Sequence, residues 1–161
     1  MTNIINIGIA EMGISDNPND RLVAANLGSC IAVSAYDPGT NRGGMIHCLL
    51  PSSELEKSKT LDNPCMYVDT GVARMLQSLL DLGSKKRDLA IFAAGGAWMH
   101  DEHGFFDIGK KNFMVLKKLL AANNLQLRAS DTGGEFSRTL TLDIGSGNIS
   151  LKTNGETVQM I

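Results

Sequence analysis

Apolar residues along this chain fall into short runs separated by turn-forming residues, a pattern typical of a protein rich in strands. Runs with the length of a strand occupy residues 4–9, 22–27, 31–36, 45–50, 89–94 and 125–130. After Arg138 the sequence predicts a meander of three strands, with turns at residues 145–148 and 154–155.

Two longer stretches follow the period of a helix instead. Residues 68–82 place apolar side chains three and four positions apart, with Asp69 or Thr70 available as a cap and Gly83 as a stop. Residues 108–123 repeat the pattern, with lysines largely on the opposite side. No repeat or linker interrupts the chain, so we expect residues 1–161 to form a single α+β domain.

The turn-rich segment 37–43 predicts a hairpin between the strands 31–36 and 45–50. Cys30 then lies at the open end of the first strand and His47 lies within the second. Their side chains can approach if the two strands pair. A thiol beside an imidazole that accepts its proton is a nucleophile suited to acyl transfer through a thioester.

Composition and charge narrow the class of protein. The chain of 161 residues has 15 basic and 17 acidic residues, mostly dispersed, so nucleic acid is not an expected partner. It shows neither a signal peptide nor an apolar stretch long enough to span a membrane, so we expect a cytoplasmic protein without membrane insertion. The three cysteines are expected to be free thiols.

Cys30 directly follows a predicted sharp turn at Gly28 and Ser29. Backbone N–H groups in such a turn can converge and stabilise an oxyanion beside a thiolate, and Gly28 lets a substrate backbone come close. Free cysteine is also among the most buried residue types, so Cys30 can equally be a packing residue at the start of a strand.

His47 shares one face of its predicted strand with Met45 and Leu49, which suits a buried core histidine as well as a base. Cys48 points to the opposite face and is expected to pack in the core. No neighbour of Cys65 in the sequence would activate a thiol.

The segment from His100 to His103 holds four possible metal ligands. Its histidines are three residues apart, which does not fit the helical zinc motif, so we expect a polar loop and no metal. The nearby Trp98, Phe105 and Phe106 either present aromatic rings to a partner protein or belong to the core.

Two glycine pairs, Gly95-Gly96 and Gly133-Gly134, each follow a predicted strand. Neither carries the lysine of a P-loop or the spaced glycines of a dinucleotide site. We expect tight turns, and no nucleotide or other cofactor.

Taken together, six motifs in this order resemble the CheD family, the chemoreceptor glutamine deamidases of bacterial chemotaxis. The resemblance covers residues 5 to about 138, and its carriers are Leu27-Gly28-Ser29-Cys30, Gly44-Met45-Ile46-His47, Tyr67-Val68-Asp69-Thr70, Gly95-Gly96-Ala97, Ile108-Gly109 with Asn112, and Asp131-Thr132-Gly133-Gly134.

The resemblance implies that Cys30 is the catalytic cysteine and His47 the catalytic histidine. It also implies a β-sandwich-like core with flanking helices, similar to toxin-type cysteine deamidases. The implied reaction converts glutamines on the cytoplasmic helices of chemoreceptors to glutamate, which would place the protein at receptor arrays.

One position departs from the family pattern. The third catalytic residue of the family is a threonine six residues before the cysteine, where this chain has Ala24. Because an imidazole needs a partner on its second nitrogen, we expect the backbone carbonyl of Ala24 or the side chain of Asn26 to orient His47.

Two other functions fit the same sequence. The family also binds the chemotaxis phosphatase CheC, so this chain can be mainly a binding partner with weak catalysis. A thiol protease or a transglutaminase would use the same cysteine and histidine with a different acceptor.

Overall fold

A computed structural model describes residues 1–54, 62–98 and 107–160. Within these ranges the strands form two five-stranded sheets. The first sheet has the order β1 (Asn3–Asn6), β3 (Asp20–Leu27), β8 (Arg138–Asp143), β9 (Ile149–Thr153) and β10 (Glu156–Gln159). The second sheet has the order β2 (Glu11–Ser15), β5 (Arg42–Cys48), β4 (Ile31–Asp37), β6 (Ala90–Gly95) and β7 (Leu127–Thr132).

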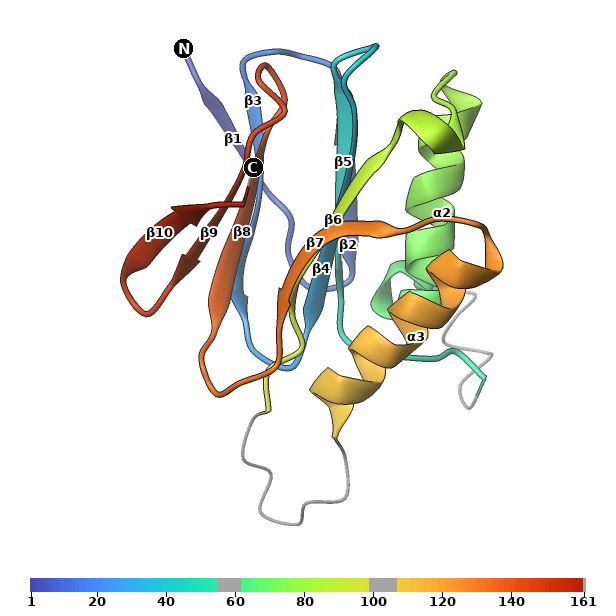
Figure 1. The fold of residues 1–161 in the computed structure, drawn as a ribbon, viewed down its shortest axis with the longest axis vertical. Coiled ribbons are helices and arrows are strands. Elements are labelled where there is room, and N and C mark those ends of the chain that lie inside the picture. Colours follow the sequence, from blue (N-terminus) through green and yellow to red (C-terminus); the bar gives the residue numbers. More distant parts are fainter. Residues whose placement is uncertain (55–61, 99–106, 161) are drawn as a thin grey trace.

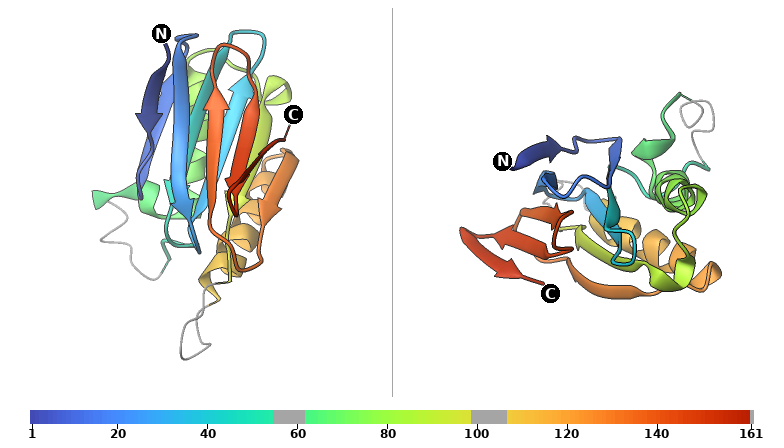
Figure 2. Two further views of the ribbon diagram at one scale, coloured as in Figure 1. Left: turned by 90° about the vertical axis from the view of Figure 1, so that its left-hand side faces the viewer. Right: turned by 90° about the horizontal axis from the view of Figure 1, so that it is seen from above.

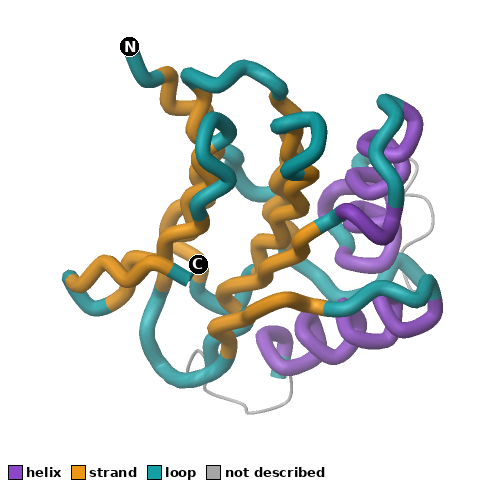
Figure 3. The backbone as a smooth tube through the Cα atoms, turned by 45° about the horizontal axis from the view of Figure 1, so that its top comes forward, coloured by secondary structure: helices purple, strands orange, loops and turns teal. Residues whose placement is uncertain are grey.

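The two sheets and two helices form three layers (Figures 1 and 2). The first sheet packs against one face of the second sheet, and α2 (Val68–Asp81) and α3 (Ile108–Ala122) cover the other face. Short 3-10 helices, η1 (Pro64–Met66) and η2 (Lys86–Asp88), precede α2 and β6. Figure 3 shows both long helices on one side of the strands. The predicted α+β fold is therefore confirmed.

The central strand β4 is buried along its whole length because it lies between two cores. Ala32 and Tyr36 face the core between the sheets, whereas Ile31, Val33 and Ala35 face the core beneath the helices. Strand alternation thus assigns each side chain near the start of β4 to one of two separate environments.

Several predicted elements occur as the sequence indicates. The hairpin of β4 and β5 turns at residues 38–41, and the tail forms the meander of β8, β9 and β10. Both helices begin at the expected residue. The cap of α2 differs: Tyr67 is its N-cap and makes no side-chain cap hydrogen bond, while Asp69 lies in the first turn.

The prediction for the N-terminus is correct for the first strand but places its end too late and misses the second strand. Strand β1 ends at Asn6, and residues 11–15 form the unpredicted strand β2 in the other sheet. Between them the chain crosses from one sheet to the other, and Ala10 adopts a φ of 63°. The apolar run 4–9 does not reveal this crossover, because Ile7 and Ile9 continue the apolar composition of β1 beyond the end of the strand.

Among the described residues, no helix has the length and apolar character to cross a membrane.

Candidate active site

Cys30 lies between β3 and β4, immediately after the predicted turn at Gly28 and Ser29. This turn is at the lower end of the molecule in Figure 1, next to the end of β6 and the start of α3. The Cys30 side chain is buried in the core between the sheets, with 7% of the residue exposed.

Three consecutive carbonyl groups hold this turn in place. The Gly28 carbonyl accepts a hydrogen bond from the Ala97 N–H at 2.8 Å, and the Cys30 carbonyl accepts one from the Gly96 N–H at 2.8 Å. The Ser29 carbonyl accepts one from Nδ2 of Asn112 at 2.9 Å. In a trans peptide the carbonyl and the following N–H point in opposite directions. The N–H groups of Ser29 and Cys30 therefore point away from these partners.

The segment that holds the turn is itself closely packed. Gly109, in the first turn of α3, lies against the backbone of Gly96 and Ala97, where an added Cβ would come within 2.3 Å of the Ala97 carbonyl oxygen. Gly133 donates its N–H to the carbonyls of Gly95 and Gly96 at 3.2 Å. Both predicted glycine turns thus meet beside Cys30.

His47 lies on β5, directly opposite Ala32 of β4. Cys30 is two residues before Ala32, just outside the strand ladder, and it lies diagonally across from His47. Diagonal positions in paired strands are about 7–8 Å apart between Cα atoms. Met45 packs in the core between the sheets and Cys48 in the core beneath the helices. Alternation therefore places His47 on the same face as Cys30 and Cys48 on the other.

The crossover between β1 and β2 supplies a contact that orients the imidazole. Nδ1 of His47 lies 3.1 Å from the carbonyl oxygen of Ile7. A carbonyl only accepts, so this hydrogen bond requires the proton on Nδ1. In the neutral imidazole Nε2 is then unprotonated. Nε2 is buried and has no hydrogen-bond partner within the described ranges of the chain.

Ile7 occupies the role that the sequence analysis expects of Ala24 or Asn26. A bulge interrupts β3 between Ala24 and Leu27, and Asn26 has a φ of 57°. Asn26 is consequently exposed, whereas Ala24 is buried in the core between the sheets and pairs with Leu140. The two residues do not share a face.

Burial acts on both members of the pair. It raises the pKa of the Cys30 thiol, and a hydrogen bond from the residue's own N–H offsets part of this rise. Burial lowers the pKa of His47. The hydrogen bond to the Ile7 carbonyl and the negative charge of Glu11 raise this pKa and so offset part of the decrease. The resting pair at neutral pH is therefore a neutral thiol and a neutral imidazole.

Comparisons with known proteins agree with the motifs. The family described as "CheD chemotactic sensory transduction" matches residues 49–153. A protein of Solibacter usitatus named "Probable chemoreceptor glutamine deamidase CheD" is 38% identical over 96% of this chain and 92% of its own length. This chain belongs to the CheD family.

Two further CheD relatives are similar over nearly their full lengths. A "Probable chemoreceptor glutamine deamidase CheD 1" of Syntrophus aciditrophicus is 38% identical over 92% of this chain and 93% of its own. A "Probable chemoreceptor glutamine deamidase CheD 2" of Anaeromyxobacter dehalogenans is 35% identical over 95% of this chain and 96% of its own.

Other candidates of the sequence analysis have different outcomes. The segment His100 to His103, with Phe105 and Phe106, lies outside the described residues. In the part of the chain that is described, no cluster of three or more metal-ligating side chains occurs. Trp98 is 58% exposed and does not belong to either core.

Sequence reasoning missed two residues that shape the site. Ile7 acts through its backbone carbonyl, which no side-chain pattern reveals. Asn112 appears in a family motif, but its contacts were not foreseen. It occupies the buried stripe of α3 with Leu116 and Leu120, and a polar residue at such an apolar position is a usable signal.

Glu11 offers a test of the electrostatics around His47, because its Cα is paired with that of His47 across β2 and β5. We expect an NMR titration to give His47 a pKa below the ordinary value of about 6.5. Glu11→Gln removes a charge that favours the imidazolium, so the pKa should fall further. Glutamine can still accept the N–H of Gly8, as Glu11 does.

Glu156→Gln, an exposed change on β10, is the matched control and should leave the His47 titration unchanged. A rise in the His47 pKa in Glu11→Gln would contradict this account of the site.

Proposed function

We propose that this chain is a cysteine-dependent protein-glutamine deamidase that acts on the cytoplasmic helices of chemoreceptors. The observation that supports it most is the buried Nε2 of His47, which has no partner among the described residues and lies on the same face as Cys30. The contact of Nδ1 with the Ile7 carbonyl leaves this nitrogen unprotonated in the neutral ring. The names of the CheD relatives support the choice of substrate.

In the first step Sγ of Cys30 attacks the carboxamide carbon of a glutamine side chain. The new C–S bond forms while Nε2 of His47 takes the thiol proton, and the carbonyl electron pair moves to the oxygen. The N–H groups of Ser29 and Cys30, fixed by the bonds to the preceding carbonyls, stabilise this oxyanion. Gly28 leaves room for the substrate backbone.

In the following steps the imidazolium returns its proton to the amide nitrogen. The C–N bond breaks, ammonia leaves, and a thioester to Cys30 remains. A water molecule then attacks the thioester carbon, giving its proton to Nε2 of His47. The C–S bond breaks, the thiol regains the proton, and glutamate is released.

Because Cys30 and His47 are both neutral at rest, the proton moves between them only during the attack on the substrate. Cys30 and His47 exchange a proton during the attack and do not form a stable ion pair beforehand, because burial disfavours both charges. Catalytic hydrogen bonds that are long or poorly aligned at rest often tighten when substrate binds. A transglutaminase with the same cysteine and histidine would differ only in the acceptor of the acyl group, which is an amine instead of water.

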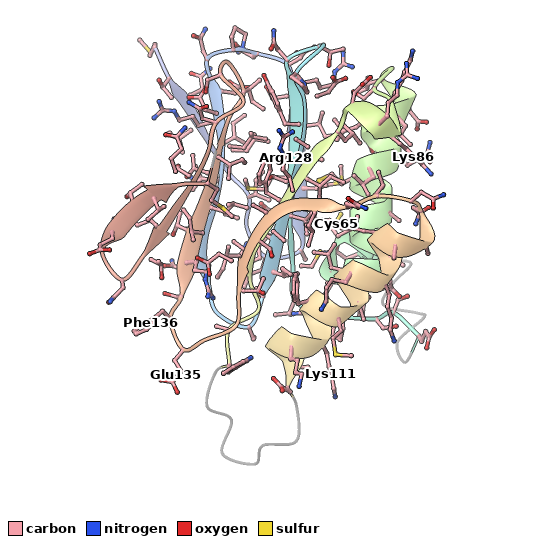
Figure 4. The ribbon with its side chains drawn as sticks, in the orientation of Figure 1. Cys65, Lys86, Lys111, Arg128, Glu135 and Phe136 are labelled. Carbon is pink, nitrogen blue, oxygen red and sulfur yellow. The ribbon has the colours of Figure 1, made fainter. Side chains whose placement is uncertain are left out.

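Two exposed aromatic residues lie at the end of the molecule that carries the turn at Cys30. Trp98 directly follows Ala97, which binds Gly28, and its N–H donates to the Gly134 carbonyl at 2.7 Å. Phe136, in the loop between β7 and β8, is 58% exposed. Figure 4 shows Phe136 and Lys111 at the same end of the molecule. A receptor helix that presents a glutamine to Cys30 would contact these side chains.

A binding role toward a CheC-type phosphatase is the second candidate function. The same exposed Trp98 and Phe136 favour it, since an aromatic surface binds a partner whether or not the cysteine reacts. Either function would act in the cytoplasm, at receptor arrays.

Replacing the nucleophile tests the reaction. Cys30→Ala should reduce deamidation of a receptor cytoplasmic fragment by several orders of magnitude, because no group remains to form the thioester. Mass spectrometry of the glutamine-containing peptides measures it. Cys65→Ala removes another buried thiol and should retain activity. Undiminished turnover in folded Cys30→Ala would refute the proposed mechanism.

Removing the exposed aromatic rings tests substrate docking. The double variant Trp98→Ala, Phe136→Ala should raise KM for a folded receptor fragment about ten-fold and leave kcat within about two-fold. Leu82→Ala is the control, since Leu82 is also exposed but follows α2 at the opposite end of the molecule. An unchanged KM in the double variant would exclude this surface from receptor binding.

A further inference from the structure

Asn112 is a fully buried polar residue in the first turns of α3. Its Nδ2 donates to the Ser29 carbonyl at 2.9 Å and to the Leu49 carbonyl at 3.3 Å. One side-chain amide therefore joins the residue before Cys30 to the residue two positions after His47.

These two contacts lie where β4 and β5 separate. The last paired residues of the two strands are Ile31 and Cys48. Beyond them Leu49 turns away, and its N–H donates to the Met66 carbonyl at 2.9 Å. Past this point the strand ladder no longer sets the spacing between the two chains, and Asn112 spans the gap.

The hydrogen bond from Asn112 to the Ser29 carbonyl also fixes the direction in which the Cys30 N–H points. The Ser29 carbonyl and the Cys30 N–H belong to one planar peptide group, so fixing the carbonyl fixes the N–H. A hydrogen bond from this N–H lowers the pKa of the Cys30 thiol, and the same N–H is one of the two proposed oxyanion donors. A rotation of this peptide would turn the oxyanion donor away from the reacting carbon.

Asn112 itself has little freedom to move. Gly109, one turn earlier, is pressed against the backbone of Gly96 and Ala97, which fixes this end of the helix. Oδ1 of Asn112 is buried without a hydrogen-bond partner in the described part of the chain. Burying an unpaired oxygen opposes folding, so stability alone does not account for an amide here.

We propose that Asn112 is a positioning residue of the site, whose two N–H groups set the spacing between Cys30 and His47 and the direction of the Cys30 N–H. This inference rests on the proposed deamidase function. It assigns no contact between Asn112 and the substrate.

The test uses Asn112→Leu, which keeps a similar size and removes both donors. Its kcat on a receptor fragment should fall about 10- to 100-fold, because small displacements of reacting groups are costly, while KM stays within about two-fold. The amide nitrogen resonance of Cys30 should also shift, since its peptide group loses a hydrogen bond.

Leu116→Ala is the matched control on the same helix. It removes buried apolar contacts and should lower the Tm without changing kcat or the Cys30 resonance. If Leu116→Ala loses as much kcat as Asn112→Leu at an equal Tm, the positioning role is refuted. An unchanged kcat in Asn112→Leu refutes it as well.

If Asn112→Leu does not fold, Asn112→Asp is the second variant that tests the positioning role. Its carboxylate has no donor to offer either carbonyl, but the protonated acid has one. Either form offers fewer donors than the amide, so kcat should stay below that of the unaltered protein at every pH, and a kcat equal to it would contradict the proposal. An unaltered protein that does not deamidate refutes the proposed function itself.

Discussion

A carbonyl oxygen can only accept a hydrogen bond, and the oxygen of Ile7 lies 3.1 Å from Nδ1 of His47. This contact places the imidazole proton on Nδ1 and leaves the lone pair on Nε2, on the face that His47 shares with Cys30. The proposed chemistry depends on this choice of tautomer. With the proton on Nε2, His47 could not take the thiol proton.

Backbone hydrogen bonds to both sheets hold Ile7 in position for its contact with His47. The Ile7 N–H donates to the Val23 carbonyl in the first sheet at 2.7 Å, while its carbonyl reaches His47 in the second sheet. The Ala10 N–H then binds the backbone carbonyl of His47 at 2.8 Å. The crossing chain is thus tied to both sheets around the histidine. On the other side of the second sheet, α3 supplies Asn112 to the turn that carries the cysteine.

The sequence predicts much of this fold and part of the site. The strand-length apolar runs and the turn-rich segment 37–43 were enough to pair β4 with β5, with Cys30 at the open end of one strand and His47 within the other. The register that places the two side chains on one face is seen only in the structure. The orienting group was not predictable in the same way. Every residue has a backbone carbonyl, so the residue type does not show which carbonyl will contact the histidine. The crossover at Ile7 also lies within an apolar run that resembles a single strand. At Asn26, the bulge in β3 broke the alternation on which the expectation relied.

The most direct test of this account is the tautomer of His47 in the resting protein, measured by long-range ¹⁵N–¹H NMR correlation of the ring at neutral pH. We predict a protonated Nδ1 and an unprotonated Nε2. In Cys30→Ala the same pattern should persist, because Ile7 and not the thiol sets it. A protonated Nε2, or a doubly protonated ring at neutral pH, would contradict the assignment of His47 as the base.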